Sequence, residues 1–253
     1  MYVEALFRPK SLESQVIYPE DARRIIIKAL DQDTTVSPLL YSRDSTGKTI
    51  GRHIGRYPAA VPVVYGGGNG FIRIYGIGDE GKEVLLKDLT RIYTALSSSL
   101  DTPIAMEMRS GKISYSVKGY RSYRINRFAL VKSARPKGDT FFGLMKRSME
   151  SKTDEEKDAA FREALPLITS ALDFWLASIA EQFGLDLPRN LDIQITGGSL
   201  GAQRVHSDRP GHVGIVRNLT FNMLGDLNGP WAIGHLRSHG CGMIRREMRE
   251  AAA

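Results

Sequence analysis

The sequence predicts an α+β protein with two halves, the first of them ferredoxin-like and the second carrying a helical insertion. Apolar residues alternate with polar ones along several short segments, as in half-buried strands, and recur every three or four residues along longer segments, as in amphipathic helices. In the first half these segments follow the order strand, helix, two strands, helix, which suits two helices covering one face of a sheet. The length of 253 residues is sufficient for two domains of about 100–130 residues each.

The first domain is expected over residues 1–101 and opens with a strand and a helix. Residues 2–7 alternate as a strand should. Pro19 suits the first turn of a helix, and the acids Glu20 and Asp21 suit its positive end. The apolar residues of this helix have the spacing of a single face: Ala22, Ile25, Ile26, Ala29 and Leu30.

A hairpin and a second helix complete the first domain. Strand-like runs at 61–65 and 71–77 are joined by the glycine-rich stretch 66–70, a hairpin signal. The second helix has an apolar face made of Val84, Leu85, Leu89, Ile92, Tyr93 and Leu96.

The second domain is expected over residues 102–253 and begins with three strands, at 104–108, 112–117 and 127–131, the first two joined by a turn at Ser110-Gly111. A basic helical insertion follows, over about 133–185. One apolar stripe runs along its later part and is typical of a core helix: Phe161, Leu165, Ile168, Leu172, Trp175, Ile179 and Phe183. Strands at 191–195 and 215–224 then flank a polar loop, 197–211, and lead to a glycine-rich C-terminal segment.

The charge of the chain favours a polyanionic partner. Thirty-five Lys and Arg residues outnumber 28 Asp and Glu residues, for a net charge of +7. A single cysteine excludes an internal disulfide framework and a cysteine-based zinc site, so the reducing cytoplasm is the expected compartment. No apolar run approaches the ~20 residues that span a bilayer, so no membrane partner is expected.

Several local matches to cofactor motifs fail. Gly47-Lys48-Thr49 resembles the end of a phosphate-binding P-loop, but Ser42 stands where that motif needs a glycine. His206 and Asp208 lack further ligands nearby, so a hydrated loop is favoured over a metal site. Neither a metal nor another cofactor is expected.

The C-terminal segment carries the most specific motif. Gly234, Gly240 and Gly242 have the spacing Gly-x5-Gly-x-Gly, and an apolar pair follows them. Between the glycines lie His235, Arg237 and His239, residue types that suit phosphate oxygens. A tight turn packed on a sheet is the alternative, because glycines also allow a backbone to turn sharply and approach another chain closely.

This segment resembles the glycine-rich loop of the RAMP superfamily, specifically of the CRISPR repeat-processing endoribonucleases. The entry to the loop departs from the pattern, because Ala232 stands where the family has a glycine. The resemblance implies an architecture of two ferredoxin-like halves. The helical insertion and the arginine-rich composition are most similar to the type IV branch, in which the processing enzyme stays bound to the mature guide RNA.

The resemblance also implies a chemistry. Enzymes of this kind use the 2′-hydroxyl of the RNA as the nucleophile, need no metal, and leave a 2′,3′-cyclic phosphate. Relatives often place a catalytic histidine near the first helix, whereas this helix carries Arg23 and Arg24. Two mechanisms stay open: His53 acts as acid or base, or arginines, among them Arg23 and Arg43, stabilise the developing charge without a histidine.

A basic, aromatic-rich stretch between Arg109 and Lys152 predicts RNA binding. A solvated strand face is the alternative. The candidate phosphate contacts in this region are Arg121, Arg124, Lys132, Arg135, Lys137, Lys146 and Arg147.

Three functions are therefore weighed. The first is an endoribonuclease that binds the CRISPR repeat hairpin, cuts precursor crRNA and works with other subunits of an effector complex. The second is a non-catalytic RNA-binding subunit of such a complex. The third is an unrelated basic RNA-binding protein in which the glycine-rich loop is structural.

Overall fold

The computed structural model describes residues 1–31, 33–43, 53–54, 57–58, 61–131, 140–188, 190–205 and 211–247. The chain divides into two compact units. Unit 1 comprises Met1–Ser114, Asn228–Pro230 and Arg237–Gly240. Unit 2 comprises Tyr115–Leu227, Trp231–Leu236 and the chain from Cys241 onward.

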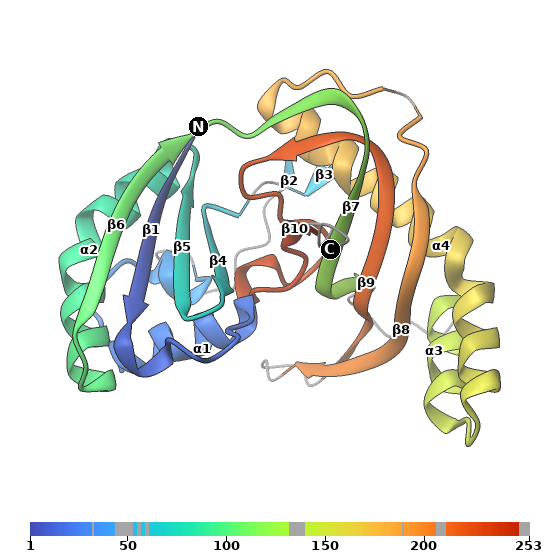
Figure 1. Ribbon diagram of the computed structural model, residues 1–253, viewed down its shortest axis with the longest axis horizontal. Coiled ribbons are helices and arrows are strands. Elements are labelled where there is room, and N and C mark those ends of the chain that lie inside the picture. The colour runs from blue at the N-terminus through green and yellow to red at the C-terminus, as the bar shows by residue number, and fades with distance from the viewer. Residues whose placement is uncertain are drawn as a thin grey trace, which may run out of the picture. The chain divides into compact units, whose positions relative to one another are not determined.

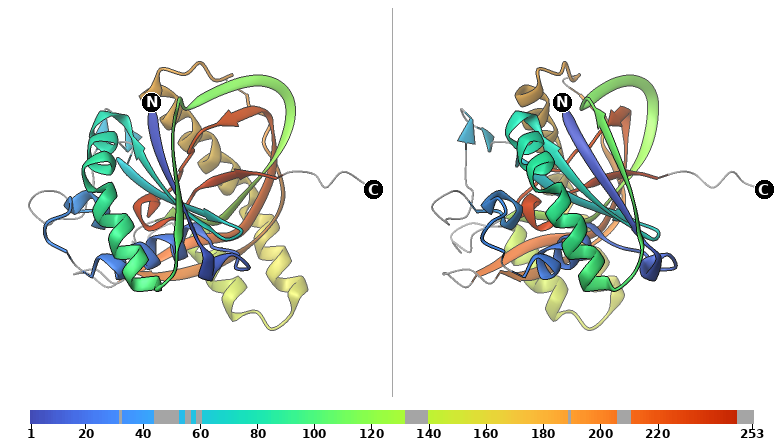
Figure 2. Two further views of the ribbon diagram at one scale, coloured as in Figure 1. Left: turned by 60° about the vertical axis from the view of Figure 1, so that its left-hand side comes forward. Right: turned by 90° about the vertical axis from the view of Figure 1, so that its left-hand side faces the viewer.

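Unit 1 is a four-stranded antiparallel sheet with two helices (Figures 1 and 2). Its elements follow one another as β1 (Tyr2–Pro9), α1 (Pro19–Leu30), β4 (Val63–Gly68), β5 (Phe71–Ile77), α2 (Gly78–Leu100) and β6 (Ile104–Gly111). The strand order β4-β5-β1-β6 is that of a ferredoxin-like fold. Shorter elements are the 3-10 turns η1 (Lys10–Leu12) and η2 (Pro38–Tyr41), and the hairpin of β2 (His53–Ile54) and β3 (Tyr57–Pro58).

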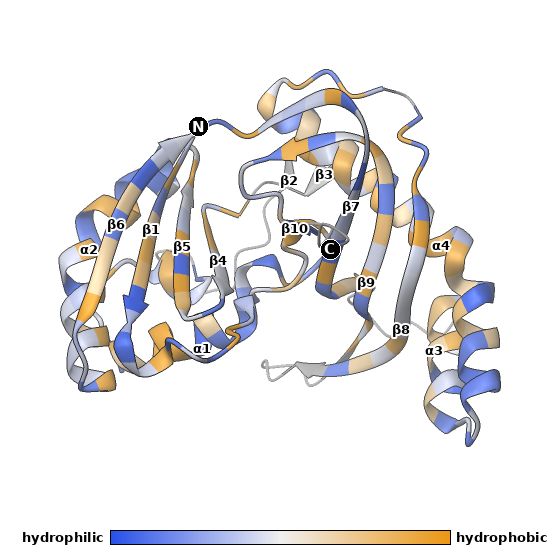
Figure 3. Cartoon of the chain, viewed as in Figure 1, coloured by the Kyte–Doolittle hydropathy of each residue, from blue (hydrophilic) through white to orange (hydrophobic). Residues whose placement is uncertain are grey.

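The core of unit 1 lies between the sheet and the two helices. Alternate residues of β1, namely Val3, Ala5 and Phe7, are buried with Ile26 of α1 and Ile92 of α2. Figure 3 shows hydrophobic residues recurring along the strands and helices that supply this core.

Strand β6 belongs to the sheet of unit 1, although it lies beyond residue 101, where the sequence placed the end of the first domain. It pairs with β1 along its whole length, from Ile104 opposite Pro9 to Gly111 opposite Tyr2. The turn expected at Ser110-Gly111 therefore does not join two paired strands, because both residues lie inside β6 and the next strand belongs to another sheet.

Unit 2 contains a second antiparallel sheet, of order β10-β7-β9-β8. Its elements are β7 (Ser114–Val131), α3 (Thr140–Glu150), α4 (Asp154–Phe183), β8 (Gln194–Val205), β9 (Gly211–Asn228) and β10 (Ile244–Arg246). This order is again ferredoxin-like, but residues 229–243, between the last two strands, form the 3-10 turn η3 (Arg237–His239) and the glycine-rich segment instead of an α-helix.

The strands of unit 2 are longer than the sequence predicts. The runs expected at 112–117 and 127–131 are parts of the single strand β7. The polar loop expected over 197–211 is largely strand, because β8 and β9 continue pairing from Leu200 opposite Val216 to Val205 opposite Gly211. The pairing register between β8 and β9 shifts near Gly197, where Gly198 and Asn218 have positive φ.

Helix α4 packs against α3 and β8. Thr153 caps its first turn by accepting a hydrogen bond from the Glu156 N–H at 3.3 Å, and Gly184, with φ 61°, ends it. The predicted apolar stripe is buried at Ile168, Leu172 and Ile179. Among the described residues α4 alone is long and apolar enough to cross a membrane, and 44% of its most apolar window is buried within the protein.

Candidate nucleic-acid interface

The part of the glycine-rich segment that belongs to unit 1 packs on the start of α1. Turn η3 contacts α1 and β4, and it closes with a hydrogen bond from the Gly240 N–H to the Arg237 carbonyl at 3.0 Å. Gly240 has φ +87°, and a Cβ there would lie 2.6 Å from the backbone nitrogen of Glu20. Only glycine therefore allows the loop to approach the helix so closely.

The segment before residue 44 is attached to the same loop. Ser42 is buried and donates from Oγ to the Ser238 carbonyl at 3.2 Å. Its own turn is held by the Tyr65 hydroxyl, which donates to the Leu40 carbonyl at 2.5 Å, and by Asp88, which accepts the Ser37 N–H at 2.8 Å. These bonds fix the backbone that carries the exposed side chain of Arg43.

The two arginines of α1 differ in their surroundings. Arg24 is 78% exposed and forms an ion pair with Asp21 at 2.7 Å, so it lies on the solvated face of the helix. Arg23 is half-buried. Burial raises the pKa of Tyr65, which lies in β4, whereas the positive charge of Arg23 acts to lower this pKa. Because such an effect requires proximity, Arg23 lies on the side of α1 that faces β4.

Arg237 lies inside the protein rather than on its surface. Its exposed fraction is 7%, and desolvation by burial lowers the pKa of its guanidinium to about 10. His239, two residues later, is half-buried. Within η3, His239 is therefore better placed than Arg237 to meet a phosphate from solvent.

The part of the segment in unit 2 is a tightly packed turn. Gly234 and Gly242 have φ +79° and +77°, and a Cβ on Gly242 would lie 1.7 Å from the Ile233 carbonyl oxygen. The His235 N–H donates to the Ala129 carbonyl at 2.8 Å, and the half-buried His235 ring packs edge-on against Trp175. The single cysteine, Cys241, is buried in one hydrophobic cluster with Ala129. The glycines are thus required by the backbone, and phosphate contacts by this segment stay a prediction.

Three of the basic residues predicted to bind RNA form ion pairs, two of them with acidic residues that are distant in sequence. Arg124 pairs with Glu247 at 3.1 Å, Arg147 with Glu163 at 2.6 Å, and Lys146 with Glu150 at 3.8 Å. Lys132, Arg135 and Lys137 lie outside the described residues, and His53 is described only as part of β2.

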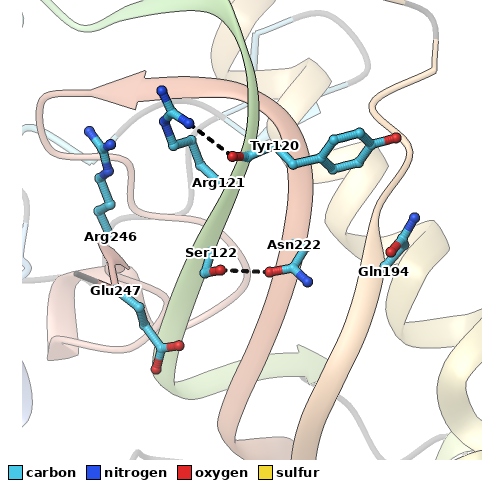
Figure 4. A pocket seen from close by; sticks show the side chains of 7 residues that line it. All are labelled: Tyr120, Arg121, Ser122, Gln194, Asn222, Arg246 and Glu247. Carbon is cyan, nitrogen blue, oxygen red and sulfur yellow. Dashed lines mark hydrogen bonds between the residues drawn. The ribbon is translucent and has the colours of Figure 1, made fainter. Parts of the chain in front are cut away.

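A polar groove lies on the sheet of unit 2 and is named here the sheet groove (Figure 4). Sequence reasoning did not predict it. Tyr120, Arg121 and Ser122 of β7 line it together with Gln194 of β8 and Asn222 of β9. Arg246 and Glu247, at the end of β10, complete the lining of this cavity of about 910 Å³. Tyr120 and Arg121 stand out in the sequence as part of the basic aromatic stretch, but the others do not, because only strand register brings them together.

Within the described ranges no three His, Cys, Asp or Glu side chains gather as metal ligands. The described residues of unit 1 with side chains suited to phosphate are the half-buried Arg23, the exposed Arg43 and the half-buried His239. Backbone packing holds the loop that carries His239 against α1.

Residues 4–248 match the family described as type IV CRISPR-associated endonuclease Csf5. The chain belongs to this family. The resemblance to CRISPR repeat-processing endoribonucleases, and to their type IV branch, is thereby confirmed. No curated protein matches the sequence.

Two solved structures share this fold. One, titled "Csf5, CRISPR-Cas type IV Cas6 crRNA endonuclease", is 19% identical with a TM-score of 0.69, and the match covers 98% of this chain and 99% of that one. A crystal structure of Cas6b is 12% identical with a TM-score of 0.51 and coverages of 98% and 100%. The prediction of two ferredoxin-like halves is confirmed.

Proposed function

We propose that this endonuclease cuts precursor CRISPR RNA at its repeat hairpin without a metal ion. In this reaction the ribose 2′-oxygen attacks the adjacent phosphorus and the bond to the 5′-oxygen breaks. The 2′-hydroxyl gives up its proton and the leaving oxygen gains one. The products are a 2′,3′-cyclic phosphate and a 5′-hydroxyl.

The packing of the loop at Arg237–Gly240 on the start of α1 carries this proposal. The same unit contains Arg23, Arg43 and the half-buried His239. A phosphorane carries extra negative charge, and positioned guanidinium groups stabilise such charge more effectively in a partly dehydrated site. The half-buried Arg23 suits this role better than Arg24, which is solvated and paired with Asp21.

Proton transfer needs a different group, because arginine stays protonated and is a poor base. His53 keeps the auxiliary role that the sequence suggested for it. The family's description as an endonuclease favours cutting over the second candidate, a subunit that binds guide RNA without cleaving it. We place the enzyme in the cytoplasm, bound to the mature guide and to other effector-complex subunits.

The decisive test incubates the purified protein in EDTA with a labelled CRISPR repeat from an array beside its gene. Cleavage at one site, with a 3′ end that resists phosphatase until acid opens the cyclic phosphate, is the expected result. Tight binding without cleavage would favour the non-catalytic subunit. Loss of cleavage in EDTA with recovery in Mg²⁺ would overturn metal independence.

Replacing Arg23 then tests its role. We expect Arg23→Ala to lower the single-turnover cleavage rate by about 10²–10³-fold, as when one charge-stabilising donor is removed, while hairpin affinity changes little. Lys28→Ala removes the same charge from the last turn of the same helix and serves as the matched control. Equal losses of rate and affinity in Arg23→Ala would identify Arg23 as a binding residue.

A further inference from the structure

We propose that the sheet groove of unit 2 binds an unpaired stretch of the RNA substrate. This inference rests on the proposed function, since it adds a subsite to the same enzyme. The groove lies on strands β7, β8 and β9 and at the end of β10, and it presents an aromatic ring, amide groups and guanidinium groups (Figure 4). Those are the groups that recognise bases and phosphates of single-stranded RNA on sheet surfaces.

Tyr120 offers a ring for stacking. Its side chain is 50% exposed, and its hydroxyl donates a hydrogen bond to the carboxylate of Asp192. A ring anchored in this way loses little conformational freedom when a base stacks on it, so the anchoring favours binding.

The two amides of the groove have preset orientations. Ser122 Oγ donates to Asn222 Oδ1 at 2.7 Å, so the N–H groups of Asn222 point away from Ser122 (Figure 4). Gln194 Nε2 lies 3.5 Å from both carboxylate oxygens of Asp192, which directs the Gln194 carbonyl oxygen the other way. The groove therefore presents an oriented donor and an oriented acceptor, as recognition of a base edge requires.

Charged groups complete the groove. Arg121 donates from one guanidinium nitrogen to the Tyr120 carbonyl at 3.0 Å, and a guanidinium has further N–H groups for a phosphate. Arg246 is held by Asp226 at 3.1 Å. Glu247, whose carboxylate is 3.1 Å from Arg124, can accept from a base amino group.

An unpaired strand fits this chemistry better than the hairpin stem. In a paired stem the Watson–Crick edges are already occupied, and the deep major groove of A-form RNA keeps side chains from its bases. A ring for stacking and amides for base edges are useful only where the bases are splayed out. We therefore assign the sheet groove to single-stranded RNA next to the hairpin.

Fluorescence anisotropy with a labelled eight-nucleotide RNA of mixed sequence, and with a blunt RNA hairpin, tests the inference. We expect Tyr120→Ala, and the double variant Gln194→Ala/Asn222→Ala, each to weaken binding of the octamer by about tenfold or more. Affinity for the blunt hairpin should stay within about twofold, because the stem does not need the groove. Gln15→Ala, an exposed glutamine of unit 1, is the matched control.

The milder Asn222→Asp variant keeps the size of the side chain, and thermal melting identifies any variant that fails to fold. Equal octamer affinity in folded variants and wild type would overturn the inference, as would selective binding of an unrelated peptide at the groove. The outcomes separate the two proposals. Octamer binding that depends on the groove without any repeat cleavage contradicts only the proposed function, whereas repeat cleavage with groove-independent octamer binding contradicts only this inference.

Discussion

Glycines in this chain differ sharply in what an added methyl group would meet. At Gly240 a Cβ would collide with the backbone of Pro19 and Glu20, at 2.6 Å, in a conformation with φ +87°. At Gly143, an exposed residue inside α3, a Cβ would have nothing within 4 Å. The same substitution therefore has opposite consequences at the two sites.

We expect Gly143→Ala to raise the free energy of unfolding by about 0.5–1 kcal/mol, because alanine loses less backbone entropy in a helix. Gly240→Ala should lower the melting temperature and the rate of repeat cleavage together, since η3 can no longer seat on α1. Thermal melting and a single-turnover assay measure both effects. A Gly240→Ala protein with wild-type stability and rate would contradict the close packing of this loop.

The sequence located some residues of the candidate site and missed others for a physical reason. The glycine spacing identified Gly234, Gly240 and Gly242, because positive φ and close approach restrict those positions to glycine. Asn222 and Gln194 carried no such signal. Their pairing across β8 and β9 depends on a register that the irregularity near Gly197 shifts, and no local pattern encodes it.

At the scale of elements, periodicity located the helices well and the strand ends less well. Helix α1 begins at Pro19 as expected, since proline and two acids mark its first turn. Strand β6 was assigned to the wrong sheet, because its sequence cannot show that its partner is β1, about a hundred residues earlier. The sequence predicts two strands in the region of the single strand β7, because turn-forming residues such as Gly119 lie within it.

Tyr123 ties β7 to the end of β9. Its hydroxyl donates to the Gly225 carbonyl and accepts from the Leu227 N–H, each at 3.0 Å, and burial raises its pKa from 10.0 to about 12. A raised pKa means that the folded state favours the protonated phenol. The resulting stability is complete below the unfolded pKa and is lost as pH rises toward the folded one.

We therefore expect the free energy of unfolding to fall between about pH 10 and 12, the window set by these two pKa values. Tyr123→Phe should be less stable at pH 8, by about 1 kcal/mol, because the Leu227 N–H loses its partner. Above pH 10 the free energy of unfolding of this variant should fall less steeply than that of the wild type. Urea denaturation across this range measures both changes. An unchanged alkaline slope in Tyr123→Phe would assign the pH dependence to other groups.

The net charge of the whole molecule, +7, is lower than its basic stretch suggests, because acidic residues far along the chain pair with several of the cations. Residue counting identified the basic stretch correctly but could not foresee that Glu247 and Glu163 pair with Arg124 and Arg147. Lys146 and its partner Glu150, 3.8 Å away, are both exposed on α3, so a phosphate can recruit Lys146 more easily.

Binding of the repeat RNA should therefore weaken steeply as salt rises, since each neutralised phosphate releases counterions. We expect Lys146→Ala to reduce the slope of log affinity against log salt by about one if Lys146 contacts a phosphate. Lys28→Ala, which makes the same change of charge on α1, should leave the slope unaltered. Filter binding between low and physiological KCl measures the slopes, and identical slopes for the two variants would remove Lys146 from the interface.

The C-terminal chain changes unit three times within a few residues: 228–230 belong to unit 1, 231–236 to unit 2, 237–240 to unit 1, and Cys241 onward to unit 2 again. No single break in the gene can therefore yield two complete halves. A fragment ending at Ser114 would lack Arg237–Gly240, and a fragment starting at Tyr115 would carry those residues without the helix they cover. Split versions should therefore regain activity only when both fragments are mixed.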